Sequence, residues 1–133
     1  MDYLDTLDDA QHAAVVAGEG LVRVKAGAGT GKTRVLTTRI VHLVKAKGVD
    51  PKGVYATTFT NKAAREMRER ALDMGGNALA GVRFSTLHAM AARIVRRHWE
   101  AAGLRSAEFN IADEDETKLI MAEAVKTSGV LGE

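Results

Sequence analysis

Residues 26–33 read AGAGTGKT, a glycine-rich turn that ends in Gly-Lys-Thr. The turn follows a short apolar run, residues 21–24, and from Lys32 onward apolar residues recur at the spacing of a helix. Strand, glycine-rich turn and helix in this order are the setting of a P-loop, whose backbone N–H groups cradle the phosphates of a nucleotide. The strict pattern begins with Gly where this chain has Ala26, which is also small. The sequence therefore predicts a site for a nucleoside triphosphate.

Two residues at the end of the turn carry the predicted chemistry. Lys32 brings a full charge to the β- and γ-phosphates, and the Thr33 hydroxyl is the predicted ligand for Mg²⁺. We therefore predict both as catalytic residues. The helix that follows adds unsatisfied N–H groups and a partial positive charge. The residues predicted to bind phosphate and metal are Ala26, Gly27, Ala28, Gly29, Thr30, Gly31, Lys32 and Thr33.

Strand and helix patterns alternate on both sides of the turn. Expected strands, which are short and rich in β-branched or aromatic residues, cover residues 21–24, 54–59 and 82–86, and residues 109–112 form a short extended piece. Expected helices cover residues 8–17, 32–47, 62–72, 87–102 and about 113–126. Asn61 is the expected cap of the third helix, and Gly75-Gly76 breaks it. The alternation predicts an α/β fold with a parallel sheet.

Composition and charge narrow the class of protein. The chain has 133 residues, of which 46% are hydrophobic and 27% charged, as in globular proteins, and no cysteine for a disulfide or thiolate metal site. Residues 21–105 carry seventeen Lys and Arg against five Asp and Glu, whereas residues 1–20 and 106–133 are acidic. A basic middle suits a polyanionic partner, with solvated helix faces as the alternative. No apolar run approaches the roughly 20 residues that span a bilayer, and residues 1–9 lack the basic and apolar regions of a signal peptide. We therefore expect a cytoplasmic protein without a membrane anchor.

Three further segments match motifs of one helicase family. Residues 7–15 read LDDAQHAAV, residues 57–67 read TTFTNKAAREM and residues 84–90 read FSTLHAM. Together with the P-loop pattern, they resemble the Q-motif, motif Ia and motif Ib of UvrD/Rep/PcrA-type superfamily 1A DNA helicases. The resemblance runs from about residue 5 to 128. It implies a P-loop NTPase fold of RecA-like type: a partial parallel sheet flanked by helices, with a short helical extension at the C-terminal end.

The resemblance also implies how the nucleotide is recognised. Gln11 reads the adenine edge, since a side-chain amide donates and accepts at once, as adenine N6 and N7 require. Arg34, directly after the P-loop pattern, resembles the family arginine that packs on the base. ATP and Mg²⁺ are therefore the expected cofactors. Taken alone, Gln11 is a solvated helix residue.

Single-stranded DNA is the partner that the same resemblance implies. Phe59 can stack on a base, and Thr60, Asn61 and Lys62 stand where side chains and helix amides can bind phosphates. The motif Ib-like segment contributes Thr86 and His88, although Leu87 replaces the usual aromatic residue between them. A histidine at a helix start is more often structural when it stands alone. Arginines 93, 96 and 97 with His98 either add charge facing the DNA or are solvated.

The last part of the chain resembles the passage into an inserted domain. Residues 109–114 read FNIADE, which superficially mimics a Walker B strand, but Asp113 and Glu116 have the spacing of a helix-capping pair. We therefore expect residues 1–105 to be the N-terminal part of the RecA-like ATP-binding domain 1A. Residues 106–133 are expected to be the start of the helical domain 1B.

The resemblance implies the ATP-binding segment of a 3′-to-5′ DNA helicase or translocase that acts on single-stranded DNA or 3′-tailed duplexes. Walker B and a second RecA-like domain are not found in the sequence, so we expect a fragment that hydrolyses ATP negligibly by itself. Two alternatives stay open. One is the N-terminus of an AddA- or RecB-type helicase–nuclease subunit, and the other is a non-catalytic module that binds ATP or single-stranded DNA.

Overall fold

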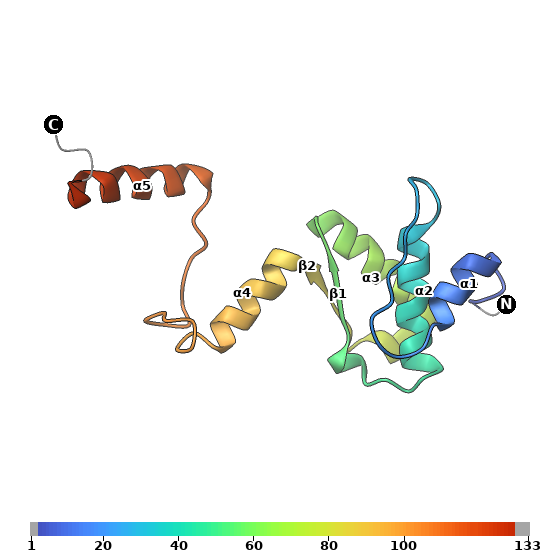
Figure 1. Ribbon diagram of the computed structural model, residues 1–133. Coiled ribbons are helices and arrows are strands. Elements are labelled where there is room, and N and C mark those ends of the chain that lie inside the picture. The colour runs from blue at the N-terminus through green and yellow to red at the C-terminus, as the bar shows by residue number, and fades with distance from the viewer. Residues whose placement is uncertain (1–2, 130–133) are drawn as a thin grey trace. The chain divides into compact units, whose positions relative to one another are not determined.

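A computed structural model describes residues 3–129 of the chain, which falls into two compact units, Met1–Ala91 and Ala92–Glu133. The first unit is built around a two-stranded parallel sheet of β1 (Tyr55–Thr58) and β2 (Arg83–Thr86) (Figure 1). Thr58 pairs with Thr86, so both strands end at the same edge of the sheet. The described residues therefore have the α/β class that the alternating patterns predicted.

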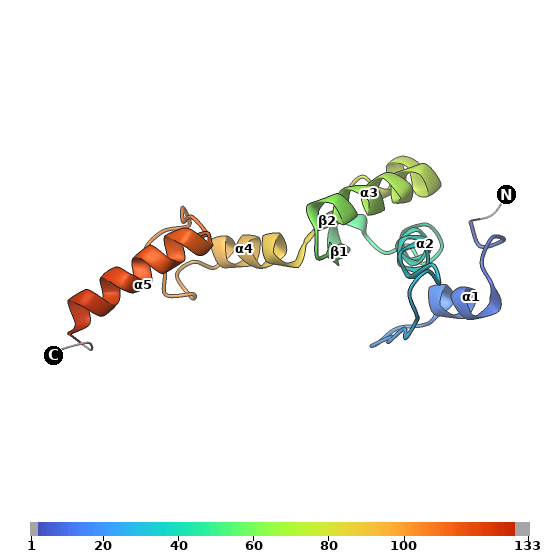
Figure 2. The same cartoon turned by 90° about the horizontal axis from the view of Figure 1, so that it is seen from above.

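Three helices of the first unit pack in succession beside the sheet. They are α1 (Asp9–Val16), α2 (Lys32–Lys45) and α3 (Asn61–Gly75), and Figure 2 shows them side by side with the strands next to α3. Two short 3₁₀ turns, Pro51–Gly53 and Gly76–Leu79, lead into β1 and toward β2. The resulting core consists of Ile40, Val41, Ala56, Met67, Ala71, Leu79 and Val82.

The two faces of the sheet differ in burial. Ala56 points into the core and is buried, and Phe84 packs against that core from the neighbouring strand. On the other face the Arg83 guanidinium lies 5.3 Å from the centre of the Tyr55 ring, and Tyr55 is exposed. Alternation of inward and outward side chains along each strand explains this division.

The predicted strand at residues 21–24 does not form. This segment is irregular, and Leu21 is fully exposed. A strand is stabilised by its ladder of backbone hydrogen bonds and by a covered face, and the two described strands pair only with each other. The P-loop pattern is therefore preceded by an irregular segment rather than by a strand within the described residues.

Two helix boundaries also differ from those predicted. Thr60, not Asn61, caps α3: its hydroxyl accepts a hydrogen bond from the Ala63 N–H at 3.1 Å, and Asn61 is the first helical residue. The helix predicted for residues 87–102 is α4 (Leu87–Arg97), followed by turns up to Gly103, whose φ of 72° ends helical geometry. The break predicted at Gly75-Gly76 is confirmed.

The second unit contains the rest of α4 and α5 (Glu114–Ser128). Asp113 and Glu116 form a reciprocal capping box at the start of α5, as their spacing predicted. Residues 109–112 form no strand, so the resemblance of this segment to a Walker B strand is superficial. The domain boundary expected at residue 105 stays a prediction, since the compact units divide within α4. None of the described helices has the length and apolar character that a membrane crossing requires.

Candidate functional site

The glycine loop, residues 26–31, leads directly into the N-terminus of α2. Gly29 and Gly31 have φ values of 76° and 81°, a left-handed conformation that favours glycine. Gly31 is the N-cap of α2, so no side chain caps this helix, and its first turn holds no acidic residue. Free N–H groups and the helix dipole therefore remain available to an anion at this point.

Lys32 folds back over the glycine loop. Its Nζ donates to the Gly27 carbonyl and, at 3.4 Å, to the Ala26 carbonyl. The Thr30 hydroxyl donates to the Gly27 carbonyl at 2.9 Å, which closes the loop from its other side. Lys32 is exposed, so its ammonium can exchange these neutral carbonyls for a more strongly attractive anion.

Gln11 of α1 lies against the glycine loop, and its predicted role in reading adenine stays a prediction. Its Nε2 donates to the Thr30 carbonyl at 3.2 Å, and its Oε1 accepts from the Asp8 N–H at 3.3 Å. Asp8 in turn accepts from the Gln11 N–H at 2.8 Å, which completes a capping box. A Cβ atom at Gly31 would stand 3.1 Å from Gln11 Nε2, so glycine is also needed here for close approach.

A cavity of about 340 Å³ lies beside α1, the glycine loop and the first turn of α2. This volume falls at the lower end of the range for small-molecule sites. Its walls come from α1, the loop and α2: Asp8, Ala10, Gln11, Ala14, Val24, Lys25, Ala26, Gly27, Thr30, Lys32 and Val35. The lining combines the Gln11 amide, the Lys25 and Lys32 ammonium groups and the Asp8 carboxylate with apolar side chains, so it offers groups suited to a base and to a phosphate chain.

Thr33 and Arg34 occupy the first turn of α2 and are both exposed. Neither side chain hydrogen-bonds within the described residues, so both are accessible to a ligand near the helix N-terminus. The described residues hold no group of three or more His, Cys, Asp or Glu side chains that could bind a metal ion.

A second candidate surface lies at the carboxyl edge of the sheet. The pairing of Thr58 with Thr86 brings the segment after β1 and the segment after β2 to this edge. Phe59 follows β1 with 92% of its surface exposed, and Thr60, Asn61 and Lys62 beside it are exposed too. A bare aromatic ring next to polar groups and a cation suits stacking with nucleic-acid bases. We call Phe59–Lys62 and Leu87–His88 together the sheet edge.

Two of the predicted DNA contacts have structural roles as well. The Thr60 hydroxyl caps α3, and the Thr86 hydroxyl accepts from the Ala89 N–H at 3.1 Å at the start of α4. Thr86 is buried, whereas His88 is exposed. Thr86 therefore shapes this junction, while His88 and Phe59 present free surface.

In the second unit, the basic end of α4 is partly engaged. The Arg96 guanidinium lies 4.8 Å from the centre of the Phe109 ring, and Arg96 also donates to the Phe109 carbonyl at 3.4 Å. Arg93 and Arg97 are exposed. Arg96 therefore holds the chain that leads to α5, and the two other arginines remain solvated.

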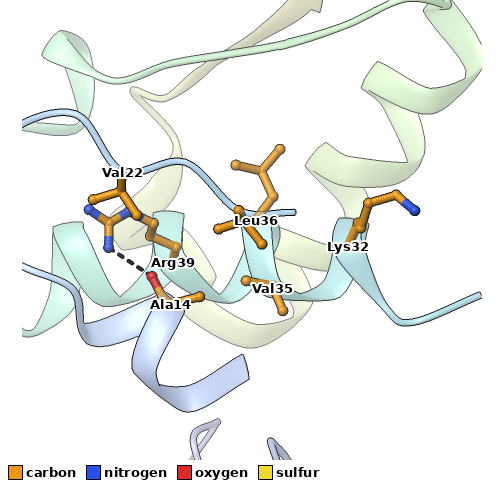
Figure 3. A pocket seen from close by; sticks show the side chains of 7 residues that line it. Ala14, Val22, Lys32, Val35, Leu36 and Arg39 are labelled. Atoms are coloured by element: carbon orange, nitrogen blue, oxygen red, sulfur yellow. Dashed lines mark hydrogen bonds between the residues drawn. The ribbon is translucent and has the colours of Figure 1, made fainter. Parts of the chain in front are cut away.

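Arg39 was not among the predicted site residues, yet it lines a cavity next to the one beside the glycine loop. It lies on the otherwise apolar stripe of α2 and lines a second cavity, of about 320 Å³, which shares Lys32 and Val35 with the first (Figure 3). A single arginine within an apolar stripe is the signal that could have revealed it, because a partly buried guanidinium requires hydrogen-bond acceptors.

Comparison with known proteins shows to which family the chain is similar. The model of the family described as UvrD/REP helicase N-terminal domain matches residues 7–130. The chain is 42% identical over 129 residues to a probable DNA helicase II homolog of Mycoplasma capricolum, covering 97% of this chain and 18% of that protein. It is 41% identical over 127 residues to the ATP-dependent DNA helicase PcrA of Staphylococcus aureus, covering 96% and 17%. For PcrA of Leuconostoc citreum the identity is 46% over 120 residues, covering 90% and 16%. The chain thus spans less than a fifth of the length of these relatives.

Proposed function

Because the chain belongs to the UvrD/REP helicase N-terminal domain family, we propose that it is the ATP-binding segment of an ATP-dependent 3′-to-5′ DNA helicase or translocase. The observation that carries the proposal is the contact of Gln11 with the glycine loop. It brings a group suited to adenine beside groups suited to phosphate, around one cavity. The ATP-dependent helicases among the relatives support the same nucleotide.

The chain's own residues divide the binding of ATP between them. Lys32 leaves the loop carbonyls to neutralise the β- and γ-phosphates, and the free N–H groups of the α2 N-terminus donate to phosphate oxygens. Gln11 hydrogen-bonds the adenine edge, and Arg34 packs on the base from the first turn of α2. Thr33 offers a hydroxyl to Mg²⁺, which when bound would neutralise phosphate charge.

The sheet edge is the proposed site for single-stranded DNA, including the strand of a 3′-tailed duplex. Phe59 stacks on a base, and Asn61, Lys62 and His88 contact phosphates from the exposed junctions after the two strands. The hydroxyls of Thr60 and Thr86 hold the ends of α3 and α4 in place for these contacts.

This 133-residue chain binds nucleotide but hydrolyses it negligibly. Hydrolysis needs a carboxylate to hold the metal, a base to orient water and a cation to stabilise the transition state. The side chains that we assign to the nucleotide, Gln11, Lys32, Thr33 and Arg34, include no carboxylate. Steady release of phosphate that is stimulated by DNA would contradict this part of the proposal.

Two single substitutions test the two sites separately. Lys32→Ala should weaken binding of a fluorescent ATP analogue by about 10-fold or more, the effect of one charge-assisted contact, and leave oligo-dT binding unchanged. Phe59→Ala should weaken salt-dependent binding of oligo-dT by about 5- to 150-fold, as one lost stacking partner does, and leave ATP binding unchanged. If both ligands bind equally well to both variants, the proposed sites are wrong.

Titrating each ligand in the presence and absence of the other addresses the alternative of a non-catalytic binding module. Such a module would bind only one of the two ligands, or both without any effect of one on the other. The names of the relatives, DNA helicase II homolog and PcrA, favour the helicase over a helicase–nuclease subunit.

A further inference from the structure

Arg39 closes the C-terminal end of α1 from a different helix. Its Nη1 donates to the carbonyls of Ala14, Val15 and Ala17 at 3.0, 3.1 and 2.9 Å. Its Nη2 lies 3.4 Å from the Gly18 carbonyl. Helix α1 has only eight residues and no basic residue in its last turn, so these carbonyls have no cationic partner within the helix itself. Figure 3 shows the guanidinium pointing at the Ala14 carbonyl.

Arg39 also lies on α2, the helix that begins at the glycine loop. It lies seven residues after Lys32 on α2, about 10 Å along a helix axis at 1.5 Å per residue. In Figure 3, Lys32 and Arg39 lie at opposite ends of the row of labelled side chains. One continuous helix therefore carries both the cation for phosphate and the cation that holds α1.

Helix α1 in turn carries the amide that faces the loop. Gln11 stands three and four residues before Ala14 and Val15, whose carbonyls Arg39 binds. Val15 is fully buried, but apolar contact has no preferred direction and constrains the rotation of α1 only weakly. The directional hydrogen bonds of the guanidinium supply that constraint, because its planar N–H groups meet several carbonyls at once.

We infer that Arg39 is a positioning residue for recognition of the base. By binding the end of α1 it holds Gln11 in register with the glycine loop, so that the adenine-reading amide and the phosphate-binding residues form one site. This role rests on the proposed function of Gln11, but the positioning itself can be measured without any nucleotide.

The sequence offers a direct reporter of that register. Gln11 is the only glutamine in the chain, so labelling the side chain with ¹⁵N-glutamine gives one side-chain ¹⁵N signal in NMR spectra. In Arg39→Met this signal should move to the position of a solvent-exposed glutamine, because the bond to the Thr30 carbonyl is lost. Arg39→Lys, which keeps the charge but not the planar fork, should give an intermediate position. Arg68→Met, on the exposed surface of α3, is the matched control and should change nothing.

Binding measurements test the consequence for specificity. Adenine offers one donor and one acceptor to an amide, whereas guanine offers two acceptors. Arg39→Met should therefore lower the preference for ATP over GTP by about 3- to 10-fold, the worth of one hydrogen bond, and Gln11→Ala should lower it by the same factor. The double variant should lose no more than Gln11→Ala alone, since Arg39 acts through Gln11. Binding of inorganic tripolyphosphate should stay within about twofold, because Lys32 and the α2 N-terminus are untouched.

The outcomes separate the two proposals. If Arg39→Met lowers the melting temperature while the Gln11 signal keeps its position, Arg39 is merely structural and the inference is wrong. Additive losses of ATP preference in the double variant also contradict it. If the wild-type chain shows no preference for ATP, adenine recognition by Gln11 fails, and the Gln11 signal still decides whether Arg39 positions it. Should Arg39→Met lose helix content, Arg39→Lys decides by the same comparisons.

Discussion

The glycine loop before α2 and the sheet edge after β1 and β2 differ in what supports them. Residues 21–30 are exposed throughout, and the loop is held by the hydrogen bonds of Gln11, Thr30 and Lys32. The sheet edge stands on paired strands and on a core in which Met67 and Leu79 are almost completely buried. Exposed hydrogen bonds contribute little net stability, whereas buried apolar side chains contribute much. The loop is therefore the more adaptable site, and the edge is the more rigid one.

Hydrogen exchange should give the largest contrast between the two regions. Amides of residues 21–25 should exchange almost as in an unfolded chain, because this segment has no ladder of backbone hydrogen bonds. Amides in the middle of α3, around Met67 and Ala71, should exchange only through global unfolding, a difference of about 5 kcal/mol for a marginally stable domain. Comparable protection in both segments would show that the loop has support of its own.

Replacing one leucine in the core and one before the glycine loop should change the free energy of unfolding by very different amounts. Leu79 is 1% exposed and Leu21 is 101% exposed. Leu79→Ala should lower the free energy of unfolding by about 2–5 kcal/mol because it leaves a cavity in the core. Leu21→Ala should change it by less than about 0.5 kcal/mol, as surface substitutions do. Urea denaturation followed by circular dichroism measures both, and a large effect of Leu21→Ala would mean that residue 21 packs against something.

The glycine at the start of α2 should be sensitive to a single methyl group. At Gly31 the φ of 81° and the approach of Gln11 Nε2 both oppose a Cβ atom. Gly31→Ala should therefore cost about 1–2 kcal/mol, the penalty of a left-handed conformation. Gly27→Ala is the control, since its Cβ would meet only the Thr30 methyl group at 3.7 Å. Thermal unfolding of both variants gives the comparison, and equal effects would contradict the assigned conformation of Gly31.

The cap of α3 should give the smallest of these effects. Thr60→Ala should cost about 1 kcal/mol, since it removes the acceptor for the Ala63 N–H. Asn61→Ala should cost only a few tenths of a kcal/mol or even stabilise α3, because Ala is the better helix former at its first position. Chemical denaturation measures the free energy of unfolding of both variants. A larger loss in Asn61→Ala than in Thr60→Ala would show that Asn61 is the cap.

Local patterns predicted much of the fold because their causes are local. The helices appear where apolar spacing, caps and glycines indicated them, and the Asp113–Glu116 capping box forms as its spacing required. The choice between Thr60 and Asn61 could not be made from sequence, since both residues can cap a helix. The end of α4 was placed too late for a similar reason, because the residues up to Gly103 favour a helix locally.

The candidate sites also combine features that local motifs predict with features that depend on tertiary contacts. Motifs predicted Gln11, the glycine loop, Lys32 and Phe59 as site residues because each residue type suits the chemistry of its expected ligand, and these stay predictions. The motifs could not indicate that Thr86 is buried and that its hydroxyl accepts the Ala89 N–H at the start of α4. They also could not indicate that Arg39 binds the end of α1. Those properties depend on which segments come together, and no spacing along the chain records that.

The sequence by itself determined the α/β class, the position of the glycine loop before a helix and the family to which the chain belongs. These depend on short-range geometry: the period of apolar residues, the φ angles open to glycine and the chemistry of single side chains. Only the tertiary structure decided that residues 21–24 stay unpaired, that two strand ends share one edge, and that Arg39 links α1 to α2. Strand pairing and contacts between helices need partners distant in sequence, so their outcome is fixed by packing of the whole unit.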